Sequence, residues 1–489
     1  MNFTREEINV AVSNISKDEN DDFWPDVINY RDYINNPSIF YEIDFDNYTP
    51  HSLLILDIPK PNLILRPGYF ISILDRLYFQ LILNRFSKDI DKLLVSSQIS
   101  FGYRISKKKN YFLNRNENIE SWKSFIKKSN DNFINNPNGF LLKTDINAFF
   151  EHIKIKKIIE ILKYLGTEKE ISDKLSHLLN TWCEDEIGLC QGNDCASFLA
   201  NVYLYEVDQS MIESGFNYYR FVDDIRVFSD DEIGVRRALS KLTELLRPLN
   251  LHLNGGKTEI INYSKHTTNK NNYSDTMDFV NYLMSDFDDD NCDFVDDQLK
   301  EMWDDAVINR AVDKINKTVF KFCIYKFKRL HLSHPLESIL KNNLFDPCYS
   351  KEICYYLEDY IDRVDIQRLL ISVLKSSPYL YQKIFILRAL LKANEIDMEL
   401  VLSLEKEKVY GTSNFMFIGY YLIFIAKFGS YGSKMSIKND FYQLFSNEEK
   451  IARYFLIAIK NLPDFDKNSN KLLRIFPALR NTYIFLKAS

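Results

Sequence analysis

The chain has 489 residues, 46% of them hydrophobic, so it is long enough for two or three globular domains and too apolar for a disordered protein. Only 14 glycines and 13 prolines occur, which argues against a turn-rich all-β fold and favours long helices. The net charge of −6 excludes a basic footprint over the whole chain, so any nucleic-acid surface must be local.

The N-terminal residues and the cysteines indicate the compartment. The polar, acidic start of the chain is unlike a signal peptide. Seven cysteines at irregular spacing do not suggest a disulfide framework and favour a reducing environment. We therefore expect a cytoplasmic protein with no membrane partner.

Residues 1–52 are polar and mixed, and we expect a helical N-terminal extension there. From residue 53 short apolar runs broken by prolines predict strands and turns, and apolar periodicity over residues 71–94 predicts helix. Further along, the pattern predicts a strand running into a helix over residues 140–153, helices over 155–165 and 196–212, a β-hairpin over 218–228 and an amphipathic helix over 235–246.

An acidic stretch separates this half from the rest of the chain. Seven aspartates fall within residues 286–297, which is typical of a solvated linker, and we assign residues 285–297 to it. Residues 298–489 form short amphipathic or apolar helical segments with short connections, a pattern typical of stacked helix pairs. The longest apolar run covers residues 415–426 and is shorter than the roughly 18–20 residues of a membrane span, so it predicts a buried helix.

Three aspartates stand in apolar surroundings where an isolated carboxylate is costly. Asp145 follows a buried strand that contains Leu142, and Asp223 and Asp224 are adjacent in the predicted hairpin. Taken singly, Asp145 is also a candidate helix N-cap, and the pair is a candidate polar turn. Taken together, a carboxylate at a strand end and a carboxylate pair on a hairpin predict a site for divalent metal, which serves phosphoryl transfer.

The motifs around these aspartates resemble those of reverse transcriptases. The stretches "DINAFFEHI", "GLCQGNDCASFLANVYLYEVD", "FVDD" and "LHLNGGKTEI" occur in the order of the palm motifs, and the resemblance covers roughly residues 55–262. Upstream, "DRLYFQLILNRF" and "SFGYR" resemble the fingers-side motifs of group II intron and retron enzymes. The stretches "IPKPNLILRP" and "RFVDDIRVF" are most similar to bacterial abortive-infection (Abi) and defence-associated reverse transcriptases.

This resemblance implies a fold and a domain order. It implies an α+β right-hand polymerase with reverse-transcriptase fingers and palm over residues 53–284. After the linker, an all-α, repeat-like C-terminal domain is expected over residues 298–489.

The resemblance also assigns the catalytic residues. Asp145 and Asp223 would be the metal-binding pair, and Asp224 the second hairpin carboxylate, with Mg²⁺ or Mn²⁺ as the cofactor. Lys257, in "NGGKTEI", would lie near the triphosphate and donate a proton to the leaving pyrophosphate.

Further residues would bind substrate. Phe150 falls where the family keeps an aromatic gate against a ribose 2′-hydroxyl, which implies dNTPs, and a shift of one residue would give that role to Phe149. The remaining candidates for the nucleotide site and its phosphates are Gln191, Gly192, Lys60, Arg66 and Arg104. For each basic residue the alternative is a solvated surface charge.

Two positions near the aspartate pair depart from the family pattern. Phe221 replaces the usual tyrosine, so a hydroxyl is lost and the ring is kept. Arg226 is unusual on such a hairpin, and it either pairs with a nearby carboxylate or is an exposed strand charge.

For function, the resemblance implies an antiphage-defence DNA polymerase that uses dNTPs. Synthesis would need no conventional template or primer and could start from a tyrosine hydroxyl, leaving single-stranded DNA attached to protein. The tyrosines considered for priming are Tyr410, Tyr420, Tyr431 and Tyr442. The enzyme would form a homo-oligomer, a trimer or a hexamer.

Two alternatives stay open. The first is an RNA-templated reverse transcriptase that copies a partner non-coding RNA. The second is a degenerate polymerase that acts as a nucleic-acid-binding scaffold. The three retained aspartates argue against the scaffold, because an idle site has no reason to keep uncompensated carboxylates.

Overall fold

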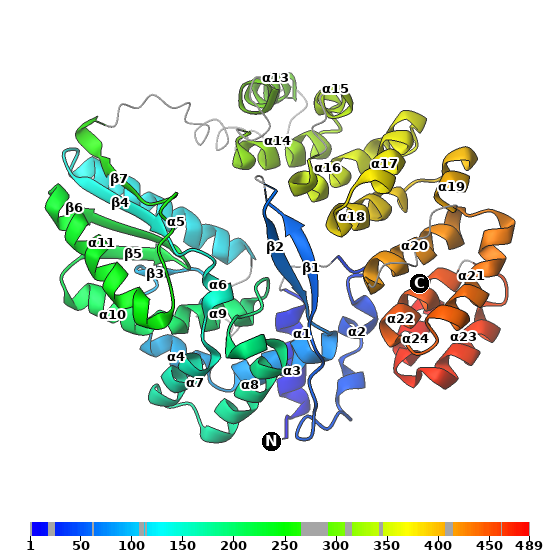
Figure 1. The fold of residues 1–489 in the computed structure, drawn as a ribbon, viewed down its shortest axis with the longest axis horizontal. Helices are drawn as coiled ribbons and strands as arrows, with labels where there is room; N and C mark the ends of the chain where they lie inside the picture. The colour runs from blue at the N-terminus through cyan, green and yellow to red at the C-terminus, as the bar shows by residue number, and fades with distance from the viewer. Residues whose placement is uncertain are drawn as a thin grey trace. The chain divides into compact units, whose positions relative to one another are not determined.

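A computed structural model describes residues 2–17, 25–60, 63–106, 112, 115–265, 292–308, 315–341, 346–405, 414–460 and 462–488 (Figure 1). The chain forms two compact units, and both are discontinuous in sequence. The first comprises Met1–Trp24, Tyr33–Ile55 and Gly68–Asn269. The second comprises Pro25–Asp32, Leu56–Pro67 and Lys270–Ser489.

The elements up to residue 265 follow the predicted order of strands and helices. They are α1 (Arg5–Ile15), α2 (Arg31–Ile34), η1 (Pro37–Phe40), β1 (Leu54–Pro59), β2 (Leu65–Phe70), α3 (Ile73–Asn84), α4 (Ser87–Leu93), β3 (Ser100–Phe101), α5 (Arg115–Asn135), β4 (Phe140–Asp145), α6 (Phe149–His152), α7 (Ile155–Tyr164), α8 (Lys169–Trp182), η2 (Glu184–Glu186), α9 (Asp194–Tyr203), α10 (Tyr205–Glu213), β5 (Asn217–Phe221), β6 (Asp224–Ser229), α11 (Glu232–Leu246), η3 (Arg247–Leu249), β7 (Glu259–Asn262) and η4 (Tyr263–Lys265).

From residue 292 onward the described elements are helical. They are α13 (Cys292–Trp303), the π-helical turn η6 (Asp304–Ile308), α14 (Lys317–Arg329), α15 (His334–Lys341), η8 (Pro347–Tyr349), α16 (Ser350–Leu357), η9 (Glu358–Tyr360), α17 (Val364–Ser376), α18 (Leu380–Leu390), α19 (Met398–Glu405), α20 (Phe415–Phe428), α21 (Tyr431–Leu444), α22 (Glu449–Ile459), α23 (Phe465–Ile475), η11 (Pro477–Leu479) and α24 (Arg480–Ala488).

The centre of the first unit is a sheet in which, among the described residues, five strands run in the order β3-β5-β6-β4-β7. The pairs β5–β6, β6–β4 and β4–β7 are antiparallel, and β3 runs parallel to β5. The predicted hairpin over residues 218–228 is thus confirmed as β5 and β6. Side chains alternate between the two faces of such strands, so the register decides which residues share a face.

Helices α11 and α5 both pack on the sheet (Figure 1). Helix α11 packs on β4, β6 and β7 through apolar residues that recur at helical spacing, such as Val235, Ala238 and Leu242. Strand residues Ile225 and Val227 are fully buried. Helix α5 packs on β3 and β5.

In the second unit the even-numbered helices form a row. Helix α14 packs on α16, α16 on α18, α18 on α20, and α20 on α22. Helices α17 and α21 pack beside this row, on α18 and α20. This arrangement is the stacking of helix pairs that the sequence predicts.

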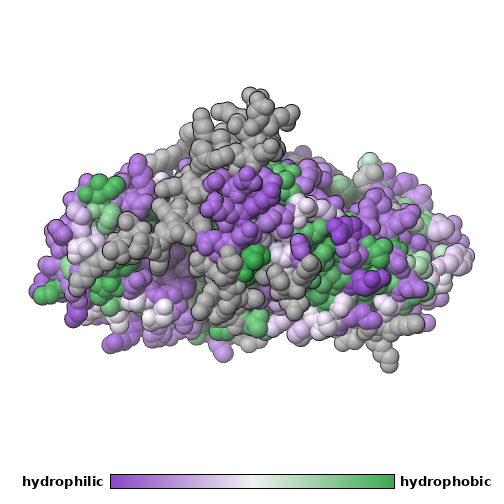
Figure 2. All heavy atoms as spheres, turned by 90° about the horizontal axis from the view of Figure 1, so that it is seen from above, coloured by the Kyte–Doolittle hydropathy of each residue, from purple (hydrophilic) through white to green (hydrophobic). Residues whose placement is uncertain are grey.

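The predicted buried helix is confirmed as α20, in which Gly419 lets Tyr454 of α22 approach so closely that a Cβ would lie 2.3 Å from its ring. None of the helices in the described part of the chain combines the length and apolarity needed to cross a membrane. Hydrophilic residues prevail on the face drawn in Figure 2, with apolar side chains scattered among them.

A buried ion cluster ties the segment Pro25–Asp32 to the C-terminal helices of the second unit. The Arg453 guanidinium donates to both carboxylate oxygens of Asp26 and of Asp32, with distances of 2.5 to 3.2 Å. Thr482 Oγ1 also donates to Asp32, at 2.8 Å. This short N-terminal segment is therefore part of the second unit.

The expected boundaries at residues 52/53, 284/285 and 297/298 stay predictions. Residues 285–291 of the expected linker lie outside the described residues, and residues 292–297 are the first half of α13.

Candidate active site

The three predicted carboxylates lie together at one end of the sheet. Asp145 is the last residue of β4 and is paired in register with Asp224, the first residue of β6. Asp223 lies in the turn before it, and its carbonyl accepts a 3.2 Å hydrogen bond from the Ile146 amide. The convergence predicted for the strand-end and hairpin carboxylates is thus what the fold produces.

The backbone contradicts the two alternative interpretations, in which Asp145 is a helix N-cap and the Asp223–Asp224 pair is a polar turn. Asp145 does not cap a helix, because the N-cap of α6 is Ala148, in the left-handed region at φ 45°. The turn is not the Asp–Asp pair, because the two loop residues are Val222 and Asp223, and Asp224 already belongs to the strand.

The turn is strained. Val222 is buried and has φ 55°, a conformation that a β-branched residue rarely adopts and that costs of order 1–3 kcal/mol. Arg220 Nη1 holds this residue by donating a 3.0 Å hydrogen bond to the Val222 carbonyl. The surrounding structure therefore fixes a turn that the local sequence does not favour.

Arg220 itself is fully buried and is fixed by two helices. Its Nε and Nη2 donate to the two carboxylate oxygens of Asp208, in α10, at 2.8 and 2.7 Å. Its Nη1 also donates to Asn201 Oδ1, in α9, at 2.7 Å. Tyr218 completes the cluster by donating to Asp208 at 2.8 Å. A bidentate pair of this kind is among the strongest charge-assisted contacts in proteins.

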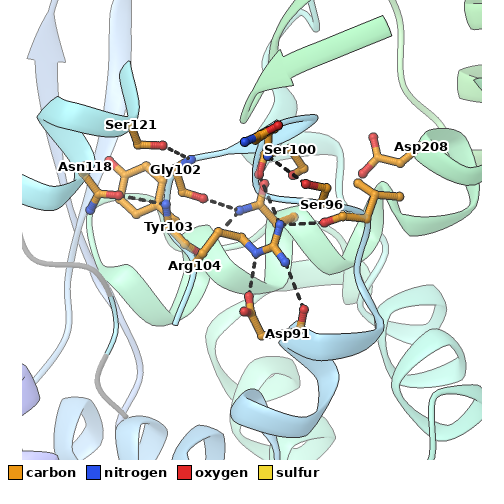
Figure 3. Close-up of polar contacts among 12 residues, drawn as sticks. Asp91, Ser96, Ser100, Gly102, Tyr103, Arg104, Asn118, Ser121 and Asp208 are labelled. Carbon is orange, nitrogen blue, oxygen red and sulfur yellow. Dashed lines mark hydrogen bonds and ion pairs between the residues drawn. The ribbon is translucent and has the colours of Figure 1, made fainter. Parts of the chain in front are cut away.

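The same cluster reaches the loop after β3. Asn201 Nδ2 donates to the Gly102 carbonyl at 3.0 Å, and the amides of Gly102 and Tyr103 are bound by Ser121 and Asn118 (Figure 3). Gly102 has φ 77°, and a Cβ there would lie 2.8 Å from the ring of Phe221.

Arg104, predicted to bind phosphate, is engaged within this loop region. Figure 3 shows its guanidinium between the loop and Asp91. Nε and Nη2 donate to the Asp91 carboxylate and carbonyl at 2.6 and 2.9 Å, and Nη1 donates to the carbonyls of Val95 and Ser100. The side chain is buried. These contacts support a structural role, and a phosphate contact stays a prediction.

The charges at the site perturb one another. Burial, together with the charges of Asp224 and Asp145, raises the pKa of Asp223 from 3.8 to about 6. Burial raises the pKa of Asp224, the charge of Arg226 opposes that rise, and the Asp145 charge adds to it. Lys257 opposes this repulsion through its ion pair with Asp145, and that hydrogen bond raises the pKa of the lysine. The carboxylates thus repel one another, and the charges of Lys257, Arg226 and Lys143 relieve that repulsion only in part.

Phe221, the departure from the family tyrosine, lies in an aromatic cluster. Its ring centroid is 5.0 Å from that of Trp122, 6.1 Å from Phe125 and 6.3 Å from Tyr103. The cluster packs the hairpin against α5 and the loop after β3.

The predicted substrate residues are placed as follows. Phe150 and Phe149 are both buried in α6, with rings 5.6 Å apart, and the Phe150 carbonyl accepts from the Leu189 amide at 2.8 Å. That bond ties α6 to the loop that carries Gln191 and Gly192. Gly192 has φ 112°, which explains the glycine.

Two predicted residues belong to the second unit. Lys60 is exposed in the loop between β1 and β2, and Arg66 is half-buried in β2. Both belong to the second unit, so their part in the site stays a prediction.

The donor set fits a hard divalent cation. All candidate ligands are carboxylate oxygens, and the buried Asp145 Oδ1 accepts no hydrogen bond. Within the described ranges no group of three or more acidic, histidine or cysteine side chains is arranged as a complete metal site. Mg²⁺ commonly uses only one or two protein carboxylates and completes its shell with substrate phosphates and water, so Asp145 with a hairpin aspartate suffices.

Comparisons with known proteins cover most of the first unit and parts of the second. Residues 58–292 match the family model described as "Reverse transcriptase (RNA-dependent DNA polymerase)". No curated protein matches the chain.

Two solved structures that resemble it are telomerases. One is apo telomerase from Candida tropicalis truncated from its C-terminal domain, at 12% identity and TM-score 0.31, covering 45% of this chain and 51% of that one. The other is telomerase from Candida albicans with a TWJ fragment of telomeric RNA, at 10% identity and TM-score 0.33, covering 76% and 71%. The chain thus spans about half the length of the first of these, and scores this low support no argument about activity.

The family match agrees with the order of motifs, the sheet and the aspartate geometry. The fold is α+β, with the fingers and palm of a right-hand polymerase followed by a helical C-terminal region. Residues 58–292 are therefore a reverse transcriptase domain, an enzyme domain of the RNA-directed DNA polymerase class.

Proposed function

We propose that the chain is a DNA polymerase that adds dNTPs by nucleotidyl transfer at Asp145, Asp223 and Asp224. The observation that carries the proposal is the register pairing of Asp145 with Asp224, with Asp223 in the adjoining turn. Three carboxylates held together against their mutual repulsion are expected where cations and phosphates are bound.

Asp145 and Asp223 would hold Mg²⁺, or Mn²⁺, with Asp224 as the supporting carboxylate. When bound, such ions stabilise charge on the attacking and leaving oxygens of the displacement. The bond formed joins the acceptor oxygen to the α-phosphorus, and the bond broken releases pyrophosphate.

Lys257 would take two roles in turn. Its ammonium, exposed and bound to Asp145, orients that carboxylate in the absence of substrate. With a triphosphate bound, it would contact the phosphates and donate the proton that the leaving pyrophosphate needs. Phe150, or Phe149 beside it, would exclude a ribose 2′-hydroxyl.

The resemblance to defence-associated enzymes supports an antiphage role, with synthesis that needs no template and starts from a tyrosine hydroxyl. Tyr431 suits priming best among the tyrosines considered, because 80% of it is exposed. Tyr420 is buried and donates to the Pro25 carbonyl at 3.1 Å, and the Tyr442 hydroxyl is buried. Tyr410 lies outside the described residues.

Two other functions remain as alternatives: copying of a partner non-coding RNA, and a scaffold role without chemistry. A homo-oligomer of three or six subunits and a cytoplasmic location are likewise proposals from the resemblance.

One experiment separates these readings. Purified protein is incubated with Mg²⁺ and each labelled dNTP, without added nucleic acid, and the products are resolved before and after protease treatment. We expect label that stays with the protein until protease is added and that is lost in Tyr431→Phe.

Each other outcome favours one alternative. Label that appears only with added or co-purified RNA supports templated synthesis. No incorporation with or without RNA would leave only the scaffold.

A further inference from the structure

We propose that Arg226 and Lys143 form a binding site for a backbone phosphate of the nucleic-acid strand that is being extended. The inference rests on the proposed function, because it places that strand along the face of the sheet that carries Asp145 and Asp224. It gives a role to the arginine that the motif comparison leaves unexplained.

The register places the two cations next to the catalytic pair. Lys143 and Arg226 are partners across β4 and β6, two residues from the partners Asp145 and Asp224. Residues two apart in a strand lie on the same face, so the four side chains share one face of the sheet. The Lys143–Arg226 pair and the Asp145–Asp224 pair are separated by roughly 7 Å along the strands.

Arg226 is held in position without a carboxylate. Its guanidinium lies over the Phe125 ring, with Cζ 4.5 Å from the centroid, and Nη1 donates to Ser129 Oγ. Ser129 is itself hydrogen-bonded to the Tyr219 hydroxyl at 3.1 Å. Among the described residues Arg226 forms no direct ion pair, and the carboxylate whose charge acts on it is that of Asp224. Arg226 is therefore neither ion-paired nor a freely solvated charge.

The remaining donors of Arg226 suit a phosphate. A guanidinium carries five N–H groups in a planar fork, and only the bond to Ser129 uses one of them in the described part of the chain. Stacking on an aromatic ring fixes the plane of the fork, and forks of this kind bind phosphate through two parallel hydrogen bonds.

Lys143 adds a second positive charge directly opposite. Its side chain is exposed, and like charges facing each other across a strand pair are destabilising. Glu259, its partner on β7, balances one of the two charges. Asp145 and Asp224 lie two residues away on the same face, and a phosphate bound between Lys143 and Arg226 would meet two cations beside carboxylates that repel it.

The neighbouring aspartates point to a strand phosphate as the anion. A strand whose end must approach three carboxylates is repelled by them, so a cation on the same face is needed to bring its backbone close. A dNTP triphosphate has the same chemistry, and the experiment therefore measures strand binding and dNTP use separately.

The test measures the affinity for a fluorescent oligothymidylate by anisotropy, with EDTA present and over a range of salt concentrations. The proteins are the unmodified chain, Arg226→Gln, Arg226→Lys and Lys143→Gln. Lys163→Gln is the matched control, because Lys163 is an exposed lysine of α7 that pairs with Asp173.

We expect Arg226→Gln to weaken binding about tenfold and to lower the salt slope by about one. Arg226→Lys should keep the salt slope and lose part of the affinity, because the fork is gone and the charge stays. Lys143→Gln, at an exposed position that folding tolerates, should lower the slope similarly. Lys163→Gln should match the unmodified chain.

An unmodified chain that fails to bind the strand, or variants with unchanged affinity and salt slope, would overturn the proposal. So would a raised KM for dNTP with unchanged strand affinity, which would assign the site to the triphosphate. Strand binding in EDTA needs no catalysis, so the two proposals can fail separately. If the unmodified chain binds the strand but incorporates no dNTP, and Arg226→Gln still weakens strand binding, the proposed function is refuted and the strand site is kept.

Discussion

Asp223 follows a strained residue, and its own charge is destabilised by burial and by neighbouring carboxylates. It follows Val222, whose φ of 55° is strained, and the two neighbouring carboxylates repel its charge. Sites that bind cations commonly combine such features. The repulsion belongs to the metal-free protein and is expected to be relieved when a cation binds.

Removing the charge should therefore stabilise the metal-free protein. In Asp223→Asn the side chain keeps its size and loses its repulsion with Asp145 and Asp224. We expect the unfolding free energy at neutral pH in EDTA to rise by on the order of 1–3 kcal/mol. Thermal melting with and without Mg²⁺ measures this, and a destabilised variant would contradict the electrostatic account.

The pH dependence of folding stability follows from the raised pKa of Asp223. The folded-state pKa of Asp223, about 6, is above its ordinary 3.8, so the folded protein holds this proton more tightly than the unfolded chain does. The stability that this group contributes is full below pH 4 and is lost as the pH rises through 6. Melting of metal-free protein should show this decline, and Asp223→Asn should lack that part of it.

At the scale of single residues, the sequence predicted those site residues that stand in recognisable motifs. Asp145, Asp223, Asp224 and Lys257 were all recognisable from their motifs, and the structure brings them together. Arg220 was not recognisable, because its importance depends on helices that the sequence does not place beside it. Nothing in its own stretch distinguishes it from a surface arginine except the apolar residues around it.

At the scale of elements, the hairpin is positioned by two buried clusters. On one face Arg220 ties it to α9 and α10, and on the other Phe221 packs among the aromatic rings of α5 and the loop after β3. The hairpin itself was predictable from its alternating pattern. Its turn was not, since Val–Asp is a poor sequence for a two-residue loop.

Breaking the Arg220 cluster should cost about 3–5 kcal/mol of stability, because Asp208 would keep a buried, unpaired charge. Arg220→Met tests this by denaturant unfolding. The double variant Arg220→Met with Asp208→Leu should recover part of the stability, since no charge is left unpaired.

The kcat of the double variant tests whether Arg220 positions the turn or only contributes to packing. If the arginine positions the turn, the double variant should still have a lower kcat with little change in the KM for dNTP. A double variant with full kcat would contradict that role.

At the scale of the whole molecule, a short N-terminal segment belongs to the unit that holds the C-terminal helices. Residues 1–52 read as one extension, yet Pro25–Asp32 belongs to the second unit through Arg453. A pairing of residues more than 400 positions apart leaves no local pattern. The helical half was predictable as stacked helix pairs because each helix carries its own apolar spacing.

The Arg453 cluster makes a prediction about the second unit. Arg453 is buried between Asp26 and Asp32, so Asp32→Ala would leave part of its guanidinium unsatisfied, at a cost of about 3 kcal/mol or more. Limited proteolysis and melting should show a weakened C-terminal helical region. Asp46→Ala is the control, because Asp46 pairs with Lys174 at the surface of the first unit, and it should have little effect.

The central claim is that Asp145, Asp223 and Asp224 form a nucleotidyl-transfer site, and Mg²⁺-dependent incorporation of labelled dNTP tests it most directly. The unmodified chain is compared with Asp223→Asn and with Asp231→Asn, whose residue caps α11 and is expected to tolerate asparagine. We predict incorporation by the unmodified chain and by Asp231→Asn, and none by Asp223→Asn although it folds. Equal incorporation by all three proteins would contradict the account.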